Sequence, residues 1–223
     1  MSNAATEPDL CLRVDVPICA FRPYESREYQ DTHPMPPPSA VYGMLLSLCG
    51  IRREHRDRHL GVRIAFAIES VPERAKVFRK LRRGKGLDDL RPDYQDLLIG
   101  LKLQVWLQSG SDRAEPSLVE RVMAALDRPQ TVDRFGGLSL GESSYLVDSI
   151  EYQEPQGEQM LYFLKPDPAG FYSLPVWIDH AANTHLRKRF SIEPMQVSSA
   201  VDNCWITIEN GRTADPAQNE HAT

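Results

Sequence analysis

The sequence has little cysteine, no long apolar run and no excess of positive charge, and each shortage excludes a class of protein. Its four cysteines are far apart, without a Cys-x-x-Cys pair, which argues against a zinc knuckle and a disulfide framework. No apolar run approaches the roughly 20 residues that span a bilayer, and residues 1–8 lack the basic and apolar character of a secretion signal. We therefore expect a cytoplasmic protein without a membrane partner.

Charge is unevenly distributed along the chain. The formal net charge of −5 over 223 residues argues against a free-standing nucleic-acid binder, which usually carries a positive field over much of its surface. From Arg74 to Lys85, however, the sequence RAKVFRKLRRGK contains seven basic residues and no acidic one. An acidic chain with one concentrated basic segment is typical of a subunit that contacts a polyanion at one place.

Patterns of apolar residues predict four strands and two helices in the first two thirds of the chain. The strands are expected at Leu10–Val16, Val62–Glu69, Leu101–Gln108 and Tyr145–Tyr152, and the helices at Ser39–Cys49 and from Pro116 to before Pro129. Residues 72–99 interrupt the series, and we expect them to form an extended hairpin. This order of elements is that of an α+β, ferredoxin-like domain of the RNA-recognition-motif (RRM) type.

We expect the ferredoxin-like domain to occupy residues 1–155. Residues 156–210 contain short strand-like pieces broken by prolines and glycine, MLYFLK, FYSLPVW and CWITIE, and predict a small β-rich C-terminal extension packed on the first part. Residues 211–223 are polar and predict a disordered tail.

A proline-rich segment leads into the first helix. Residues 33–38, HPMPPP, form a stiff segment because proline lacks an amide donor and has a fixed φ; we call them the proline strap. Ser39 is suited to cap the helix and Gly50 to end it. Gly43 inside the helix costs roughly 1 kcal/mol relative to alanine. We therefore expect a close contact at Gly43, with Tyr42 exposed beside it.

The basic segment has two interpretations. A run of charge is often only a solvated face, although such a face normally mixes both signs. The alternative is a phosphate-binding surface, in which Arg79, Lys80, Arg82 and Arg83 contact the backbone of a nucleic acid and Phe78 stacks on a base.

Residues 134–144, RFGGLSLGESS, form a second candidate site, which we call the glycine loop. It is not a nucleotide fingerprint, because it lacks both the strand-to-helix context of a dinucleotide motif and the Gly-Lys-Ser/Thr of a phosphate loop. It is either a flexible connector or a place where backbone amides approach a ligand, with Arg134 and the serines beside it. The sequence leaves both interpretations open.

Signals for catalysis are few. His55 and His59 could share a helix face, and two further histidines, His180 and His185, lie near Asp179, but no carboxylate spacing completes a metal site. We expect these histidines to be at the surface or partly buried, and we expect no cofactor. A metal-independent ribonuclease would need only a general base and a cation near the phosphate, roles that His33, Tyr42 and Lys76 could take.

Three stretches together resemble the Cas5 family of CRISPR-associated proteins, nearest to its type I-B-like branch. They are FRPY at residues 21–24, MPPPSAVYGML at residues 35–45 and FGGLSLGES at residues 135–143. The proline-Ser-Ala-Val-x-Gly helix start is the most specific of them. The resemblance extends over roughly residues 10–209.

The resemblance implies a non-catalytic subunit of a Cascade surveillance complex that caps the 5′ handle of the CRISPR RNA (crRNA). It implies a ferredoxin-like domain of the RAMP class with a β-hairpin thumb at about residues 72–99. Contacts with a Cas7-type backbone subunit, with the large Cascade subunit and with target DNA would follow. Carried over by position, the implied RNA contacts are Arg22, Ser39, Tyr42, Gly43, Lys76, Arg79, Lys80, Arg82, Arg83, Arg134, Gly136, Gly137, Ser139 and Ser143.

Two other functions remain open from the sequence. One subtype of the family cuts precursor crRNA with a tyrosine, a lysine and a histidine; here Tyr42 follows Ser-Ala-Val, but no Lys-His pair follows it, so we assign no catalytic residue. A third hypothesis is a protein-docking module in which the glycine loop packs against a neighbouring subunit.

Overall fold

The computed structural model describes residues 8–23, 29–82, 90–154, 158–197 and 201–211. Within the strands, the side chains of residues 80–82 and 90–92 are outside this description. The predicted domain boundary at residue 155 and nearly all of the predicted tail therefore lie outside the described residues, and the division into two parts stays a prediction. In the described part, no helix has the length and apolar character needed to cross a bilayer.

A mainly antiparallel sheet organises the chain, and its central strands run in the order β6-β1-β5-β3. These strands are β1 (Leu10–Cys19), β3 (Arg63–Ile68), β5 (Leu90–Gln108) and β6 (Ser149–Tyr152). The predicted strands near residues 10, 63 and 101 are confirmed. The fourth was expected from Tyr145 but begins only at Ser149, because Tyr145 turns toward the hairpin described below and Leu146 makes an isolated bridge with Ser139.

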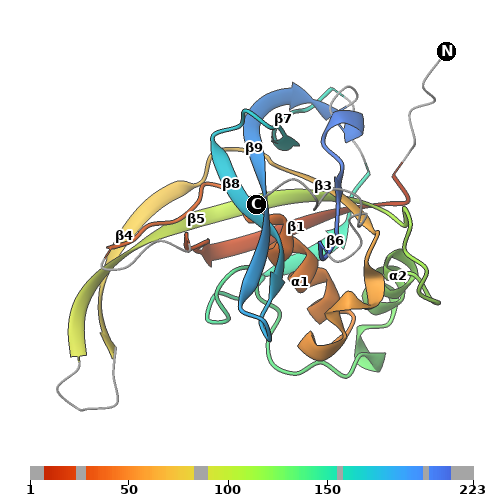
Figure 1. Cartoon of the computed structure of the whole chain (residues 1–223), viewed down its shortest axis with the longest axis horizontal. Coiled ribbons are helices and arrows are strands. Elements are labelled where there is room, and N and C mark those ends of the chain that lie inside the picture. Colours follow the sequence, from red (N-terminus) through yellow and green to blue (C-terminus); the bar gives the residue numbers. More distant parts are fainter. Residues whose placement is uncertain (1–7, 24–28, 83–89, 155–157, 198–200, 212–223) are drawn as a thin grey trace, which may run out of the picture.

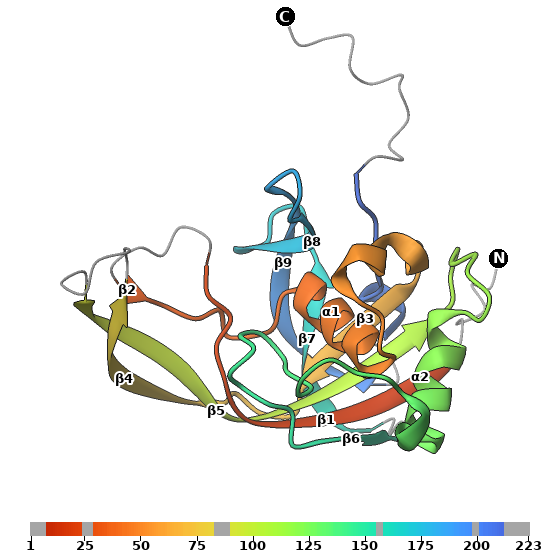
Figure 2. The same ribbon diagram turned by 90° about the horizontal axis from the view of Figure 1, so that it is seen from below.

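Two α-helices lie on one side of the sheet, α1 (Pro38–Leu48) and α2 (Leu118–Asp127), and Figure 2 shows α1 above β1 and β5. Helix α1 begins one residue before the predicted start: Pro37 is the N-cap and no side chain caps the helix, so the capping role expected of Ser39 was wrong. Proline suits this first position, because it has no amide hydrogen to leave unpaired. The positive φ of Gly50, +71°, agrees with the predicted helix end.

Three short 3-10 helices, η1 (Arg53–His59), η2 (Pro129–Thr131) and η3 (Val201–Asn203), complete the helical elements of the described residues. Strand alternation then divides the core into two layers. Leu12, Val14 and their alternate neighbours face the helices, whereas Trp106 stacks on Phe163 on the other face, with ring centroids 5.3 Å apart. Around β3 and residues 103–108 of β5, both faces of the sheet are therefore buried.

The C-terminal part adds four strands, β7 (Met160–Pro166), β8 (Tyr172–Asp179), β9 (Thr184–Gln196) and β10 (Ile206–Thr207). Strand β7 pairs with β3, so the sheet curls onward past the central strands, and β8 contacts α1 (Figure 1). The sequence analysis missed β9. Its segment carries the basic run LRKR and Pro194, which hide the strand pattern.

A long hairpin projects from the body (Figure 1). It consists of β4 (Glu73–Arg82) and the outer half of β5, paired from Glu73↔Ile99 to Arg82↔Leu90. The short strand β2 (Tyr29–Gln30) runs parallel to β5 beside it. The hairpin expected within residues 72–99 is therefore confirmed. Because β5 has 19 residues, the same strand forms one arm of the hairpin and the centre of the sheet.

Candidate nucleic-acid interface

The hairpin has two chemically different faces, because successive side chains of a strand point to opposite sides. The register pairs Phe78 with Tyr94 and Lys76 with Asp96 on one side, which also carries Arg74 and Tyr29. We call these six residues the aromatic face. The opposite side carries Gln30, Val77, Arg79, Asp93 and Gln95, which we call the polar face.

Three aromatic rings on the aromatic face are open to solvent. Phe78 is 56% exposed, Tyr94 50% and Tyr29 40%. The rings of Phe78 and Tyr94 meet edge to face, with centroids 5.4 Å apart. Exposed rings of this kind provide apolar surface on which an unpaired base can stack.

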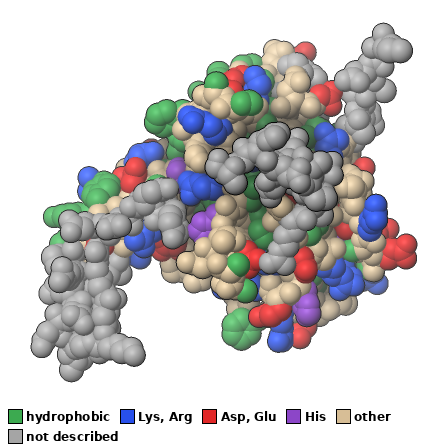
Figure 3. All heavy atoms as spheres, in the orientation of Figure 1, with side chains coloured by type: hydrophobic (Ala, Val, Ile, Leu, Met, Phe, Trp, Pro, Cys, Tyr) green, Lys and Arg blue, Asp and Glu red, His purple; other side chains and the backbone are tan. Residues whose placement is uncertain are grey.

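Cations lie among these rings. The Lys76 ammonium is 4.8 Å from the centroid of the Tyr29 ring, and its hydrogen-bonding contact with Tyr29 raises the pKa of Lys76. The Tyr29 hydroxyl donates to the Asp96 carboxylate at 2.5 Å. Arg74, with half of its side chain exposed, is 4.0 Å from Asp96. Lys76 and Arg74 therefore lie near the surface, where they can contact phosphates. Figure 3 shows hydrophobic and basic side chains together on the described part of the hairpin.

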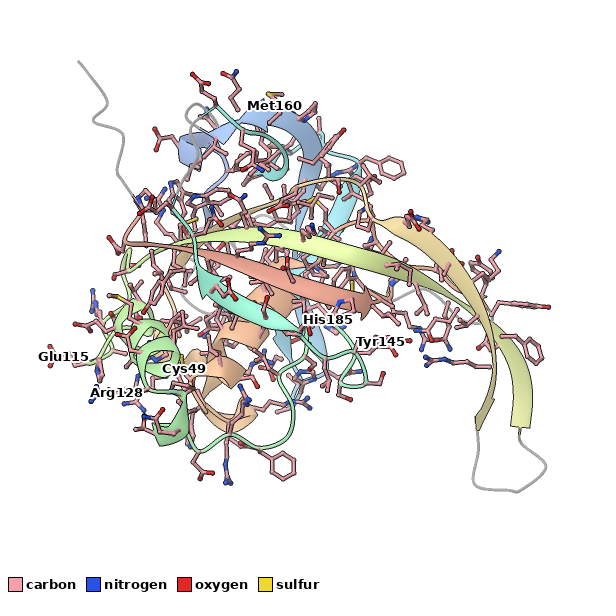
Figure 4. All side chains as sticks on the ribbon, turned by 180° about the vertical axis from the view of Figure 1, so that it is seen from behind. Cys49, Glu115, Arg128, Tyr145, Met160 and His185 are labelled. Atoms are coloured by element: carbon pink, nitrogen blue, oxygen red, sulfur yellow. The ribbon has the colours of Figure 1, made fainter. Side chains whose placement is uncertain are left out.

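The polar face is joined to the glycine loop. The Arg79 guanidinium donates to the Tyr145 hydroxyl at 2.5 Å, and this hydroxyl donates to Gln95 at 3.3 Å. The Gln95 amide also donates to Glu142 at 2.8 Å. Figure 4 shows Tyr145 beside the inner end of the hairpin. Arg79, predicted to contact phosphate, thus already has a protein partner and holds the hairpin against the loop.

The glycines of the loop approach the chain itself. Gly141 has φ +91°, and a Cβ there would lie 2.6 Å from the Ala20 carbonyl oxygen. A Cβ on Gly137 would lie 2.7 Å from Leu146, whereas the space around Gly136 is open. Gly141 therefore allows the loop to pack closely on the chain at Ala20, whereas at Gly137 only the flexible end of the Leu146 side chain would have to shift. Gly136 is the one of the three with open space for a ligand.

The other predicted contacts in this loop differ in exposure. Arg134 and Ser143 are exposed, and Ser139 is partly buried by its bridge to Leu146. Phe135, between Arg134 and the glycines, is 93% exposed. The loop therefore presents a charged and an aromatic side chain outward.

The start of α1 differs from the prediction at Tyr42. This side chain is only 3% exposed, and its hydroxyl donates to the Arg56 carbonyl oxygen at 2.6 Å, so the expectation of an exposed Tyr42 was wrong. The ring is buried beside Trp177, 6.2 Å between centroids, a neighbour 135 positions away in the sequence. Burial raises the pKa of Tyr42. Gly43, by contrast, is exposed, and a Cβ at this position would meet nothing within 4 Å outside the helix backbone.

The remaining predicted contacts are dispersed or lie outside the description. Ser39 is partly exposed near Gly43, and Arg22 is exposed after β1. Lys80 and Arg82 belong to β4, but their side chains are outside the described part, and Arg83 is entirely outside it. Of the predicted basic contacts, the structure thus brings Lys76 into the aromatic face and places Arg79 on the opposite side.

Sequence reasoning missed Tyr29 and Tyr94. Tyr94 lies in the stretch PDYQD, whose polar composition and proline suggested no regular structure. The signal that could have found it is alternation: Tyr94, Asp96 and Leu98 share one side of the strand. The alternation is inconspicuous because both sides of this strand carry polar residues.

No group of three or more potential metal ligands occurs among the described residues. The two histidines that could have shared a helix face do not: His55 is exposed with non-helical dihedral angles, and His59 is buried with its Nδ1 2.8 Å from the Asp112 carboxylate. Of these two histidines, four positions apart, His55 is thus a surface residue and His59 belongs to the interior.

Comparisons with known proteins show the family of this chain. Residues 9–160 match the family described as CRISPR-associated protein (Cas_Cas5). The CRISPR-associated protein Cas5 of Myxococcus xanthus (strain DK1622) is 36% identical over 193 residues, which is 80% of this chain and 86% of the relative.

Two solved structures share the fold. The first, a chain of a "CRISPR RNA-guided surveillance complex", has a TM-score of 0.60 and 14% identity, covering 86% of this chain and 92% of that chain. The second, "Crystal structure of Cas protein", has a TM-score of 0.50 and 17% identity over 84% and 95% of the two chains. Because the family match covers more than half of the sequence and the Myxococcus relative covers four fifths of it, the chain belongs to the Cas5 family of CRISPR-associated proteins.

Proposed function

We propose that this chain is a non-catalytic, RNA-binding subunit of a type I CRISPR Cascade surveillance complex, in which it caps the 5′ handle of the crRNA. The observation that carries the proposal is the aromatic face of the hairpin, where Phe78, Tyr94 and Tyr29 are exposed beside Lys76 and Arg74. Aromatic rings stack on bases of any sequence, and the cations neutralise phosphates. Such a surface suits unpaired RNA, whose bases are free to leave their own stack.

The strand order supports the finer fold assignment. The sequence order of β1, α1, β3, β5, α2 and β6, with the sheet order β6-β1-β5-β3, corresponds to the split βαβ arrangement of a ferredoxin-like, RRM-type domain. On this assignment, the β4–β5 hairpin is the thumb, inserted between the second and third strands. It carries the aromatic face away from the body.

Assembly with other subunits is part of the proposal. The fold is similar to that of a chain from a "CRISPR RNA-guided surveillance complex", which supports membership of such a complex. We propose a Cas7-type backbone subunit and the large Cascade subunit as partners, with target DNA nearby and the whole assembly in the cytoplasm. Phe135 and Leu146, 93% and 54% exposed at the glycine loop, offer apolar surface for one of these protein contacts.

The absence of catalysis in the proposal is supported by Tyr42. A tyrosine that acts on RNA has to reach the reacting hydroxyl or phosphate. The Tyr42 hydroxyl is instead hydrogen-bonded to the Arg56 carbonyl inside the protein, and burial raises its pKa. The rival function is metal-independent cleavage of precursor crRNA. It is tested by incubating excess protein with a repeat-containing transcript in EDTA, where we expect no cleavage.

Binding of a synthetic crRNA to the full-length protein, followed by fluorescence anisotropy, tests the main proposal. Replacing Phe78 and Tyr94 together by alanine should weaken binding at least tenfold, since each lost stacking contact is worth about 1–3 kcal/mol. The matched control is Met160→Ala, which removes a side chain that is 53% exposed at the top of Figure 4, away from the hairpin. Equal affinities for the parent, the double variant and the control would refute the proposal.

A further inference from the structure

A pocket of about 420 Å³ lies at the inner end of the aromatic face. One side of its wall is formed by Asp31 and Thr32, which precede the proline strap, and by His33, the first residue of the strap. The other residues used below are Arg74 of the aromatic face, Phe171 just before β8, and Arg187 on β9. We infer that this pocket binds a single unpaired ribonucleotide of the RNA, with its base against Phe171 and its phosphate between Arg74 and Arg187. This inference rests on the proposed function and deepens it.

Phe171 provides the stacking surface. Its side chain is 85% exposed, which leaves most of an apolar ring in water. The backbone beside the ring is held firmly, because Gly170 packs so closely that a Cβ there would lie 2.3 Å from the backbone of Phe190. The Arg189 guanidinium also donates to the Gly170 carbonyl at 2.8 Å. The ring itself meets the Tyr172 ring edge to face, with centroids 5.1 Å apart. An exposed ring on a fixed backbone, already in contact with a second ring, can be covered by a base at a reduced cost in conformational entropy.

Two guanidiniums from different parts of the chain line the same pocket. Arg187 on β9 is held in place by donating to the Ser173 hydroxyl at 3.2 Å and to the Ser173 carbonyl. Arg74 on β4 is 3.8 Å from Asp31, and its side chain is 52% exposed. Arginine is suited to phosphate because its planar fork can make two parallel hydrogen bonds. The two strands thus bring together a pair of cations that are 113 positions apart in the sequence.

The pocket also contains a carboxylate, which argues for a nucleotide over a simple phosphate ion. Asp31 accepts a hydrogen bond from the Thr32 amide at 2.7 Å and remains 55% exposed. A carboxylate repels phosphate but accepts hydrogen bonds from a base amino group or from a ribose 2′-hydroxyl. One carboxylate beside two guanidiniums therefore matches the mixed donors and acceptors of a ribonucleotide.

The residues around the strap make this wall rigid. The buried Thr32 hydroxyl accepts from the Phe21 amide at 2.8 Å and donates to the His33 carbonyl at 3.1 Å. The prolines that follow keep the chain extended into α1. The side of the pocket that Asp31, Thr32 and His33 form is thus preformed, and on this inference the proline strap supports ligand binding.

The pocket continues the aromatic face. Arg74 belongs to both, since it lines the pocket and shares its side of β4 with Lys76 and Phe78. A single strand of RNA can therefore run from Phe78 and Tyr94 past Lys76 and place one nucleotide in the pocket. The two sites make different contributions: the rings on the hairpin stack on successive bases, whereas the pocket selects one position.

An abasic scan of the RNA tests the inference. Synthetic crRNAs, each lacking one base of the 5′ handle, are titrated against the full-length parent and against Phe171→Ala. With the parent, we expect the loss of one particular base to weaken binding about tenfold, or about 1.4 kcal/mol. Phe171→Ala should bind the intact RNA more weakly than the parent does, and loss of that base should not weaken its binding further. Met160→Ala should behave like the parent.

The outcomes separate the pocket from the proposed function. If the parent binds crRNA but the abasic profile is the same in Phe171→Ala, the pocket assignment is overturned and the RNA-binding function stands. If the parent binds no crRNA, the proposed function fails and the pocket assignment fails with it. A 2′-deoxy substitution at the selected position should weaken binding to the parent, but not to Asp31→Ala, which has no side-chain acceptor, if Asp31 accepts from the 2′-hydroxyl. No effect on the parent would refute that role for Asp31.

Discussion

The Arg79 guanidinium on β4 donates to the hydroxyl of Tyr145, 66 positions further along the chain. The same hydroxyl reaches Gln95 on β5, so one tyrosine contacts both arms of the hairpin. In the described part of the hairpin, β4 packs mainly on β5, and strands with few packing partners are the first to open. The contact with Tyr145 therefore fixes the direction in which the aromatic face is presented.

Removing this hydroxyl should loosen the hairpin without unfolding the body. Tyr145→Phe deletes the acceptor for Arg79 and the donor to Gln95, at a cost of about 1 kcal/mol per hydrogen bond. We expect faster hydrogen exchange in residues 73–79 and weaker crRNA binding. Tyr152→Phe is the matched control, because its hydroxyl contacts Asp127 and the Met123 carbonyl of α2. Unchanged exchange at the hairpin in Tyr145→Phe would contradict the assigned role.

Lys76 should contribute one phosphate contact that depends on salt. The slope of log affinity against log salt concentration is about −0.7 for each phosphate neutralised on a single strand. Lys76→Gln should therefore make the slope for crRNA less negative by about 0.7. Lys165→Gln is the control, because Lys165 is paired with Glu193 at 3.1 Å on β7 and β9. Equal slopes for the parent and Lys76→Gln would place Lys76 outside the RNA contact.

How well the sequence predicts each strand depends on whether its burial follows from local alternation or from partners that are distant in the sequence. The core strand at Leu101–Gln108 is predictable because one period-2 pattern covers a strand buried by the body of the protein. The outer half of the same strand is not, because Asp93 and Gln95 are buried by other polar groups, Gln30 and Glu142, that are distant in sequence. A local pattern contains no information about such partners.

The candidate site divides in the same way. The basic composition around Lys76 and Phe78 is visible in the sequence, and so is its excess of one sign. Which side of the strand each residue occupies depends on register, which separates Arg79 from Lys76. The pocket could not be foreseen, because Arg74 and Arg187 meet only through the curled sheet, and β9 was not recognised as a strand.

Two glycines should respond to alanine in opposite directions. Gly43 lies in α1 with open space around it, so Gly43→Ala should raise the free energy of unfolding by about 1 kcal/mol through helix propensity. Gly141 has φ +91° and lies against the Ala20 carbonyl. Gly141→Ala should therefore lower it by at least 1–2 kcal/mol. Urea denaturation measures both, and a destabilised Gly43→Ala would show that the helix surface is not open.

Gly43→Leu then tests the surface for a partner. A Cβ at Gly43 would meet nothing within 4 Å outside the helix backbone, so the variant should fold, and it should assemble as the parent does if nothing docks there. Loss of assembly with the other Cascade subunits, in a variant of normal stability, would place a subunit or the RNA over the start of α1. Normal assembly would remove Gly43 from the predicted contacts.

Stability should decrease in mild acid because of His59. The side chains of His59 and Asp112 are fully buried, with Nδ1 2.8 Å from Oδ2, and Asp112 also accepts from the Leu118 amide at the start of α2. Burial outweighs the nearby carboxylate and lowers the pKa of His59 below its ordinary value of 6.5. The neutral ring therefore donates from Nδ1 to Asp112, and the pair connects η1 to α2.

The sign of the pH effect follows from proton counting. Between the lowered pKa of the folded state and the ordinary value of the unfolded state, the unfolded chain binds more protons, so stability rises with pH. The free energy of unfolding should be constant near pH 7.5 and should fall as the pH drops through about 6.5. His59→Asn should have lower stability at pH 7.5 but a flatter profile, because its amide can donate to Asp112 without titrating. The control is His55→Asn, at an exposed position on the same 3-10 helix, where the decrease in acid should persist. A parent whose stability is the same at pH 5.5 and pH 7.5 would show that His59 is not a neutral donor in the interior.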